Sequence, residues 1–287
     1  MRPEAGAFVA MVLALAAAAC AVGPKAPVAT AAAVSVVDPA AMAALAATGF
    51  LTPETTPDAT AIIPPAPVEG DARNDADWIL FRYTRALEGS ERWALAQNDD
   101  SYKPADILKD YSCAVDAELT LETAPTLSLV LTRAATDAGN AAARAKDIYK
   151  RTRPYLHNPG NICIARSEGL AKSYDYPSGH SSASWMQGLI LASLAPDRST
   201  QILQRARGYG ESRIVCGVHN WSAVEAGRTN AAGVYAALQG SPEFQKAMSQ
   251  AGTELRKARA SGRKPDAGAC TVEAKLTRPL FTDLTAK

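Results

Sequence analysis

The stretch of residues 123–151, TAPTLSLVLTRAATDAGNAAARAKDIYKR, constrains the fold of this chain more than any other. It is rich in alanine, which has the highest helix propensity, and it contains no proline after Pro125. Pro154 follows as a stop signal, because proline cannot continue a helix. We therefore predict one long helix here.

Shorter segments with helical signals flank this helix. Trp78, Phe81 and Leu87 recur at near-helical spacing, and Ser90 is suited to cap a helix that follows it. Capping and proline signals predict four later helices, at residues 179–195, 199–212, 222–238 and 242–260. No segment shows the alternation typical of a strand. The sequence therefore predicts an all-α fold with a helical bundle at its centre.

The amino-terminal part differs from the rest. Residues 1–21 contain Arg2, an apolar run and small residues that suit a signal peptidase, so we expect a signal peptide and a periplasmic or secreted protein. Cys20 follows three alanines, which leaves lipoprotein anchoring open. Residues 22–49, rich in alanine and proline, are expected to form a tether. Five prolines between residues 53 and 67 exclude a helix and favour an extended strap.

Composition narrows the function. The 287 residues carry 30 Lys and Arg against 29 Asp and Glu, without a basic block, so nucleic acid is not an expected partner. A hydrophobic content of 47% suffices for one large core, which we assign to a helical domain at 50–260 with a C-terminal tail at 261–287. No later segment is apolar enough to span a bilayer. Assembly into a homo-oligomer stays open.

Four of the five cysteines lie after the signal peptide: Cys113, Cys163, Cys216 and Cys270. An even number in an exported chain predicts two disulfides, and three pairings are open. A zinc site is the alternative use, but no two of these cysteines have the C-x-x-C spacing.

Three clusters of polar residues point to chemistry when they are read together. Lys146 and Arg153 lie seven residues apart, which would place them near one face of a helix. PSGH, ending at His180, stands at the start of a predicted helix, where free N–H groups favour an anion. Arg213 and His219 form the third cluster. A solvated face, a cap and a structural histidine would explain each cluster alone. Together they suit cleavage of a phosphate ester by two histidines and fixed cations, without a metal or cofactor.

These clusters also fit a known family. The pattern Lys-x6-Arg-Pro, Pro-Ser-Gly-His and Ser-Arg-x5-His, at residues 146–154, 177–180 and 212–219, resembles the signature of the type 2 phosphatidic acid phosphatase superfamily, which includes vanadium-dependent haloperoxidases. Segments such as LTPETTPDATAIIPP, TRALEGSERWALAQND and ESRIVCGVH resemble the secreted class A non-specific acid phosphatases of bacteria, roughly over residues 50–250. The resemblance implies a helical fold that acts on small phosphate monoesters.

The resemblance also implies roles for individual residues. His219 would form a phosphohistidine, and His180 would act as the general acid. The phosphate would be held by three cations and by the backbone at the start of a helix: Lys146, Arg153, Arg213, Ser178 and Gly179. His157 matches nothing in the pattern and is interpreted as structural.

One position departs from the family. The pattern continues His-x3-Asp, with the aspartate accepting a hydrogen bond from the nucleophilic histidine, but this chain has Ala223. If a helix begins near His219, position 223 lies one turn on and on the same face. Glu225 lies about 120° around that helix and is a poor substitute. Ser222, a backbone carbonyl or a bound water could accept the ring proton instead.

The alanine at position 223 therefore determines which alternative functions we consider. Loss of the orienting acid costs a serine protease about 10⁴ in turnover without abolishing it, so we expect reduced or retuned activity. A phosphate-binding pseudoenzyme is the rival. A haloperoxidase would need bound vanadate, and a lipid phosphatase would normally have membrane spans. Activity is expected to be highest at acid pH, because His180 must hold a proton while His219 must not, and nearby cations lower histidine pKa values.

Overall fold

Helices make up all of the regular structure that the computed structural model describes, at residues 44–45 and 47–281. No strand occurs in this range, which confirms the all-α prediction. The predicted signal peptide at 1–21, Cys20 and most of the predicted tether at 22–49 lie outside the described residues. The helices belong to one unit, Asp38–Lys287.

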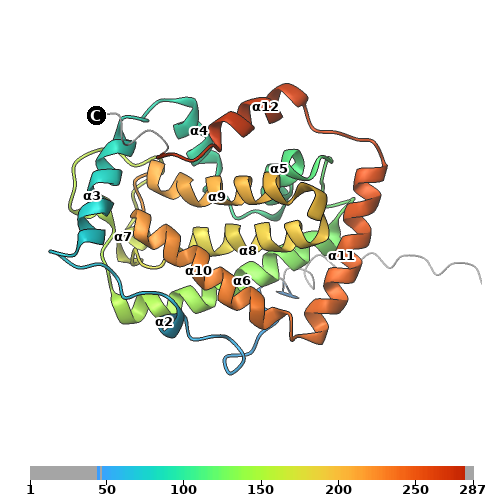
Figure 1. Ribbon diagram of the computed structural model, residues 1–287, viewed down its shortest axis with the longest axis horizontal. Helices are drawn as coiled ribbons and strands as arrows, with labels where there is room; N and C mark the ends of the chain where they lie inside the picture. Colours follow the sequence, from blue (N-terminus) through green and yellow to red (C-terminus); the bar gives the residue numbers. More distant parts are fainter. Residues whose placement is uncertain (1–43, 46, 282–287) are drawn as a thin grey trace, which may run out of the picture. The chain divides into compact units, whose positions relative to one another are not determined.

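Four helices form the centre of this unit, with α8 (Gly179–Leu194) in the middle. It packs against α6 (Pro125–Tyr149), α9 (Ser199–Val215) and α10 (Trp221–Leu238). Figure 1 shows these four running side by side, with α11 (Pro242–Ala260) crossing at one end. The predicted central bundle is therefore present.

Local signals set the ends of these helices. Pro125 stands at the first turn of α6, and the helix ends at Tyr149, where Lys150 adopts a left-handed conformation with φ of 48°. The long helix is thus confirmed, but it stops before Pro154. Ser178 caps α8 by accepting a hydrogen bond from the Ser181 amide, as the sequence predicts.

The outer helices differ from the sequence prediction in two ways. Ser90 caps α4 (Glu91–Asn98) as predicted, and α3 (Ala72–Arg85) precedes it. The prediction that the proline-rich strap contains no helix is wrong, because α2 (Ala59–Ile62) forms one turn there, capped by Asp58. The prolines flank this turn and do not interrupt it. Sequence reasoning did not predict α5 (Pro104–Val115), α7 (Glu168–Lys172) or α12 (Ala267–Leu276), although Pro104, Ser167 and Asp266 stand at their starts.

The segment expected to be a C-terminal tail, 261–287, contains α12. This helix contacts α4, and Glu273 lies 3.2 Å from the guanidinium of Arg205 in α9. A disulfide also joins its Cys270 to Cys113 of α5. The second disulfide joins Cys163 to Cys216, so all four cysteines are paired and the zinc alternative is excluded.

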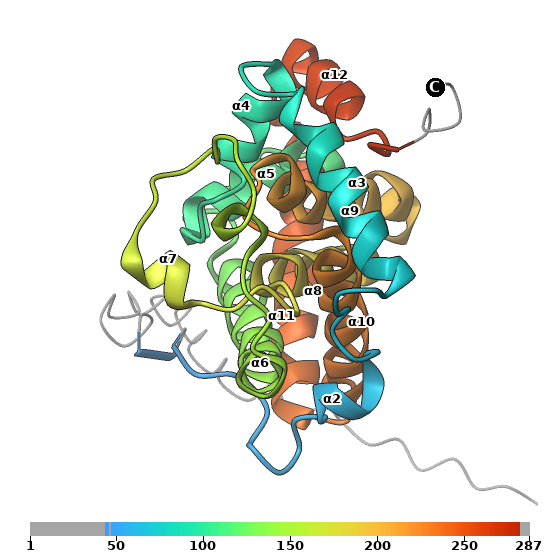
Figure 2. The same ribbon diagram turned by 90° about the vertical axis from the view of Figure 1, so that its left-hand side faces the viewer.

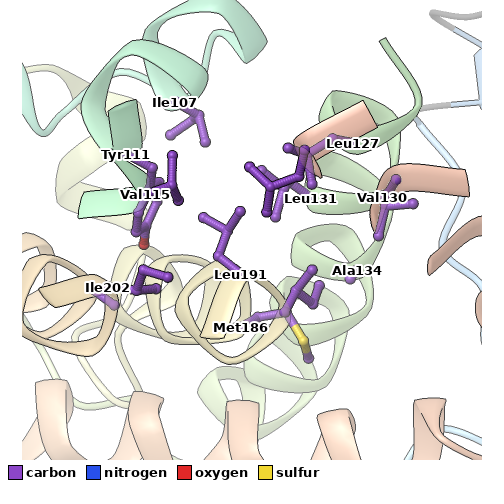
Figure 3. Packing of buried hydrophobic residues seen from close by; sticks show 14 of the residues in the cluster. Ile107, Tyr111, Val115, Leu127, Val130, Leu131, Ala134, Met186, Leu191 and Ile202 are labelled. Atoms are coloured by element: carbon purple, nitrogen blue, oxygen red, sulfur yellow. The ribbon is translucent and has the colours of Figure 1, made fainter. Parts of the chain in front are cut away.

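The main core lies between α5, α6, α8 and α9. Figure 3 shows Tyr111 and Val115 of α5 facing Leu131 of α6, with Leu191 of α8 and Ile202 of α9 closing the cluster. All five are almost completely buried. Full burial of a large apolar side chain contributes about 1.5–3 kcal/mol, so this cluster holds the four helices together.

Two glycines let the central helices approach closely enough to form the site. A Cβ added to Gly188 of α8 would lie 2.4 Å from the Cβ of Ala206 in α9. A Cβ added to Gly227 of α10 would lie 2.6 Å from the carbonyl oxygen of Ser178. Real Cβ atoms do not tolerate such distances, so glycine is required at both contacts. The start of α8 therefore lies directly against α10.

Among the described residues, no helix is both long enough and apolar enough to cross a membrane.

We expect the Cys113–Cys270 disulfide to stabilise the fold, because it closes a loop with a sequence separation of 157 residues and holds α12 in place. Replacing both cysteines with serine should lower the free energy of unfolding by about 2–4 kcal/mol. Urea denaturation of the two proteins measures this difference. Equal unfolding curves would contradict a stabilising role for the bond.

Candidate active site

The predicted site residues come from the ends of the four central helices. Lys146 lies in the last turn of α6 and Arg213 in the last turn of α9. His180 lies in the first turn of α8, and His219 stands two residues before α10. Figure 2 faces the end of the bundle at which α8 and α10 begin. The site is therefore assembled where these helix termini meet.

His219 is buried, and both of its ring nitrogens have partners. Nδ1 lies 2.9 Å from Oδ1 of Asp175, and Nε2 lies 3.1 Å from Nη1 of Arg153. A guanidinium N–H can only donate, so Nε2 is the acceptor and Nδ1 carries the ring proton. The ring thus presents the lone pair of Nε2 to the side on which Arg153 lies.

The expectation that His219 lacks an acidic partner is wrong, since Asp175 supplies one from 44 residues earlier in the chain. His219 lies outside α10, whose N-cap is Asn220, so the assumption of a helix beginning at the histidine does not hold. Ala223 packs in an apolar cluster with Tyr176. Ser222, a proposed substitute, donates to Asp77 and accepts from Arg151 instead.

Asp175 is completely buried and accepts several hydrogen bonds. The backbone N–H of Asn220 donates to Oδ1 at 3.1 Å, and the side-chain amide of Asn220 donates to Oδ2 at 2.8 Å. Arg151 lies 3.5 Å from Oδ2 and also binds Asp77 of α3 at 2.8 Å. Burial raises the pKa of Asp175, while Arg151 and the Asn220 donors oppose that rise.

Lys146 and Arg153 lie in the site together, although for a different reason than the sequence suggested. Because α6 ends at Tyr149, Arg153 belongs to the following loop and does not share a helical face with Lys146. Arg153 is held by the carbonyl oxygens of Ser173 and Val218, at 2.7 and 2.9 Å. The Lys146 ammonium contacts the carbonyl oxygen of Tyr174. Burial, with a further contribution from Arg153, lowers the pKa of Lys146 to about 7.

Arg213 is buried and only partly paired. Its Nη2 lies 2.9 Å from Oδ1 of Asp100. Its Nε and Nη1 are also buried, and they have no hydrogen-bond partner in the part of the chain that the structure describes. Two donor nitrogens are thus available to an anion.

His180 lies between Asp100 and Tyr102. Its Nε2 is 3.3 Å from the carbonyl oxygen of Asp100, and its ring centroid lies 4.0 Å from that of Tyr102. Burial lowers the pKa of His180, and Arg213 lowers it further. For His219 the first cause of a lowered pKa is again burial, followed by Arg153. Both rings are therefore neutral near neutral pH.

The start of α8 offers backbone donors beside His180. The amide of Ser178 donates to the carbonyl oxygen of Ala223 at 2.9 Å, and its hydroxyl caps the helix. Ser178 therefore positions the helix start. The amides of Gly179 and His180, in the first turn, have no acceptor within the helix and are placed to bind an anion.

A cavity of about 270 Å³ adjoins this helix start. Tyr102, Gly179 and Ala183 line one side, and Thr132, Ala135 and Gly139 of α6 line the other.

Sequence reasoning missed Asp175, Arg151, Asp100 and Tyr102. Asp175 stands two residues before PSGH, but no local pattern distinguishes it from an ordinary loop aspartate. The other three become site residues only through contacts between distant segments. His157 lies on the surface, where its Nε2 contacts the hydroxyl of Thr152 at 2.7 Å.

Known proteins are similar in sequence to this chain over most of its length. Residues 125–240 match the family model described as the PAP2 superfamily. An acid phosphatase of Zymomonas mobilis subsp. mobilis is 41% identical over 217 residues, which cover 75% of this chain and 82% of that protein. A non-specific acid phosphatase of Providencia stuartii is 34% identical over 202 residues, covering 70% of this chain and 82% of that protein. One of Salmonella typhimurium is 32% identical over 208 residues, covering 72% and 83%.

His219 should remain neutral, with its proton on Nδ1, at a pH at which an ordinary histidine is already protonated, because burial and Arg153 lower its pKa well below 6.5. The chain has three histidines, so ring ¹⁵N chemical shifts of histidine-labelled protein can report on each one. The exposed His157 supplies a reference signal. A proton on Nε2 of His219, or full titration near the usual value of 6.5, would contradict this geometry.

Proposed function

This chain belongs to the PAP2 superfamily and is an acid phosphatase, and from that premise we propose that it hydrolyses phosphate monoesters through a phosphohistidine on His219. In this proposal the reaction needs neither a metal ion nor a cofactor. The observation that carries it is the orientation of the His219 ring, with Nδ1 bonded to Asp175 and Nε2 facing Arg153.

The two histidines divide the reaction. Nε2 of His219 attacks phosphorus with its lone pair, the bond from phosphorus to the ester oxygen breaks, and His180 gives that oxygen a proton. His180 then takes a proton from water, whose oxygen attacks the phosphohistidine and releases inorganic phosphate. A bound phosphate opposes the effect of Arg213 on His180, so substrate binding raises the pKa of His180 and favours the protonated ring that the first step requires.

Fixed cations supply the charge balance for both steps. Arg153 lies beside Nε2 of His219, and Arg213 offers two buried donor nitrogens. Lys146 and the amides at the start of α8 complete the set. Cations placed where negative charge develops stabilise the transition state, which is the role that metal ions fill in other phosphatases.

The cavity beside Gly179 and Tyr102 offers space for the leaving group. Its lining combines the aromatic ring of Tyr102 with mostly small side chains, together with Ile107 and Gln187, and carries no charged group. Such a surface contacts many alcohols through packing and does not select one by charge, which supports a broad specificity for small phosphate monoesters.

Export is the second part of the proposal. The signal peptide at 1–21 and the tether at 22–49 would deliver the helical domain to the periplasm or the exterior, with Cys20 as an optional lipid anchor. Two disulfides fit an oxidising compartment. The pseudoenzyme alternative rested on Ala223, and the contact between Asp175 and His219 removes that reason.

Hydrolysis of a chromogenic phosphate ester tests the chemistry. Wild type should turn over in EDTA, and His219→Ala should be inactive because the nucleophile is lost. His157→Ala should keep wild-type activity, since His157 lies on the surface outside the site. Quenching the turnover of a ³²P-labelled ester with an alkaline denaturant should trap a phosphoenzyme that is stable to base and labile to acid, and only when His219 is present. Loss of activity in EDTA that a divalent metal restores, or a wild type no faster than His219→Ala, would overturn the proposal.

Phosphate affinity should weaken as the pH rises through about 7, because Lys146 has a pKa of about 7 and its charge is present only below that value. In Lys146→Arg the charge persists, since arginine does not deprotonate in proteins. KM should therefore rise less with pH in this variant than in wild type. Both enzymes are compared with one ester, so the titration of the substrate cancels. Parallel KM profiles would rule out a role for the Lys146 charge.

A further inference from the structure

We propose that Asp175 positions His219 for attack, and that it does so from the place that an acid at position 223 would otherwise occupy. Asp175 is a positioning residue, since it acts on phosphorus only through the histidine ring. This inference rests on the proposed phosphohistidine route, because a ring that does not attack needs no orienting acid.

The first observation that supports this role is that one oxygen atom of Asp175 accepts two hydrogen bonds. Oδ1 of Asp175 receives the ring proton of His219 at 2.9 Å and the backbone N–H of Asn220 at 3.1 Å. Any carboxylate that binds the Asn220 N–H in the same manner also lies within reach of Nδ1. The position of one oxygen atom thus links the start of α10 to the tautomer of the histidine.

Helix geometry identifies the other residue that could fill this place. Asn220 is the N-cap of α10, and Ala223 is the third residue of the helix. An acidic side chain at that third position characteristically reaches back to the N–H of the N-cap. In this chain that N–H is bonded to Asp175 instead. An acid at 223 and an acid at 175 would therefore compete for the same donors.

The start of α10 has no acidic residue of its own, and two acidic side chains from other segments accept hydrogen bonds from its N–H groups. No acidic residue stands in its first turn. Asp175 accepts from the Asn220 N–H, and Asp77 of α3 accepts from the Ser222 N–H at 2.8 Å. Negative charge at a helix start is favourable, so these carboxylates serve α10 as well as the histidine.

Asp175 is also held firmly enough to orient a ring. Arg151 and the Asn220 side chain contact its Oδ2, and its own backbone N–H donates to the carbonyl oxygen of Arg151 at 2.7 Å. The carboxylate is therefore fixed from both its backbone and its side chain.

One acid fits this site, and two do not. Ala223 is completely buried against Tyr176 and small side chains. With Asp175 in place, an aspartate at 223 would bring a second carboxylate to donors that are already used, which adds repulsion and an unpaired buried charge. Without Asp175, the same aspartate would find the Asn220 N–H and the His219 Nδ1–H free. The effect of Ala223→Asp on turnover should therefore reverse sign with the residue at 175.

Steady-state kinetics of four proteins test this reversal: wild type, Asp175→Ala, Ala223→Asp and the double variant. Asp175→Ala should lower kcat by about 10²–10⁴, with little change in KM, because ring orientation matters in the transition state and phosphate is held by the cations. Ala223→Asp alone should lower kcat. The double variant should exceed Asp175→Ala by at least about tenfold.

A matched control separates orientation from a general effect of buried charge. Ala226 lies in the same apolar cluster as Ala223 and is also buried. It stands three residues further into α10, away from the N-cap. Ala226→Asp in the Asp175→Ala background should give no recovery of kcat. Equal recovery from positions 223 and 226 would contradict the proposal.

The Asp175→Asn variant is the control for loss of folding, because asparagine has the same side-chain shape as aspartate. A carboxamide has one oxygen where the carboxylate has two, and it cannot accept every hydrogen bond that Asp175 accepts. We expect a folded protein by circular dichroism, a low kcat and, in ¹⁵N spectra, a changed chemical shift for Nδ1 of His219, whose acceptor is then a carboxamide or absent.

The outcomes distinguish this inference from the proposed function. A wild type without phosphatase turnover would refute the proposed function. An active wild type whose kcat survives Asp175→Asn, or a folded double variant no faster than Asp175→Ala, would overturn the role of Asp175 alone.

Discussion

The Asp175 carboxylate imposes a condition on the whole site, because burying such a charge costs several kcal/mol unless partners surround it. Its partners come from separate segments. Arg151 follows α6, Asn220 caps α10, and Arg151 in turn binds Asp77 of α3. The carboxylate is thus satisfied only when these three segments have packed together. The orientation of His219 is therefore a product of tertiary assembly.

The cations beside this carboxylate, in contrast, are not all satisfied by partners among the described residues. Burial lowers the pKa of His219 most, and the nearby charges of Arg153, Lys146 and Arg213 lower it further. Buried polar groups without a partner cost about 1–3 kcal/mol each, and Arg213 has two atoms that find no partner among the described residues. An anion that binds them recovers this cost. The fold thus gives up stability at the place where a phosphate gains affinity.

Sequence reasoning succeeded where the cause is local and failed where it is spatial. The bounds of α11 and the capping role of Ser178 follow from neighbouring residues. The residues of the three motifs do gather at one end of the bundle, although Lys146 and Arg153 approach through a loop. Asp175 escaped notice because its contact with His219 spans 44 residues. Sequence reasoning treated Ala223 as the loss of the orienting acid, because it considered only residues on the same predicted helix as His219. Helix α12 also escaped notice, since it is held by partners as distant as Cys113.

The exchange between positions 175 and 223 bears on how such a site can change over generations. If one acid serves and two conflict, a lineage cannot move the acid by single substitutions without passing through a chain with both or with neither. Both intermediates are impaired, so each placement resists drift toward the other. A comparison of motifs position by position counts only the loss at 223 and ranks such a chain as degenerate. Under the proposed role of Asp175, the feature that must be kept is a carboxylate at one point in space, and either residue number could supply it.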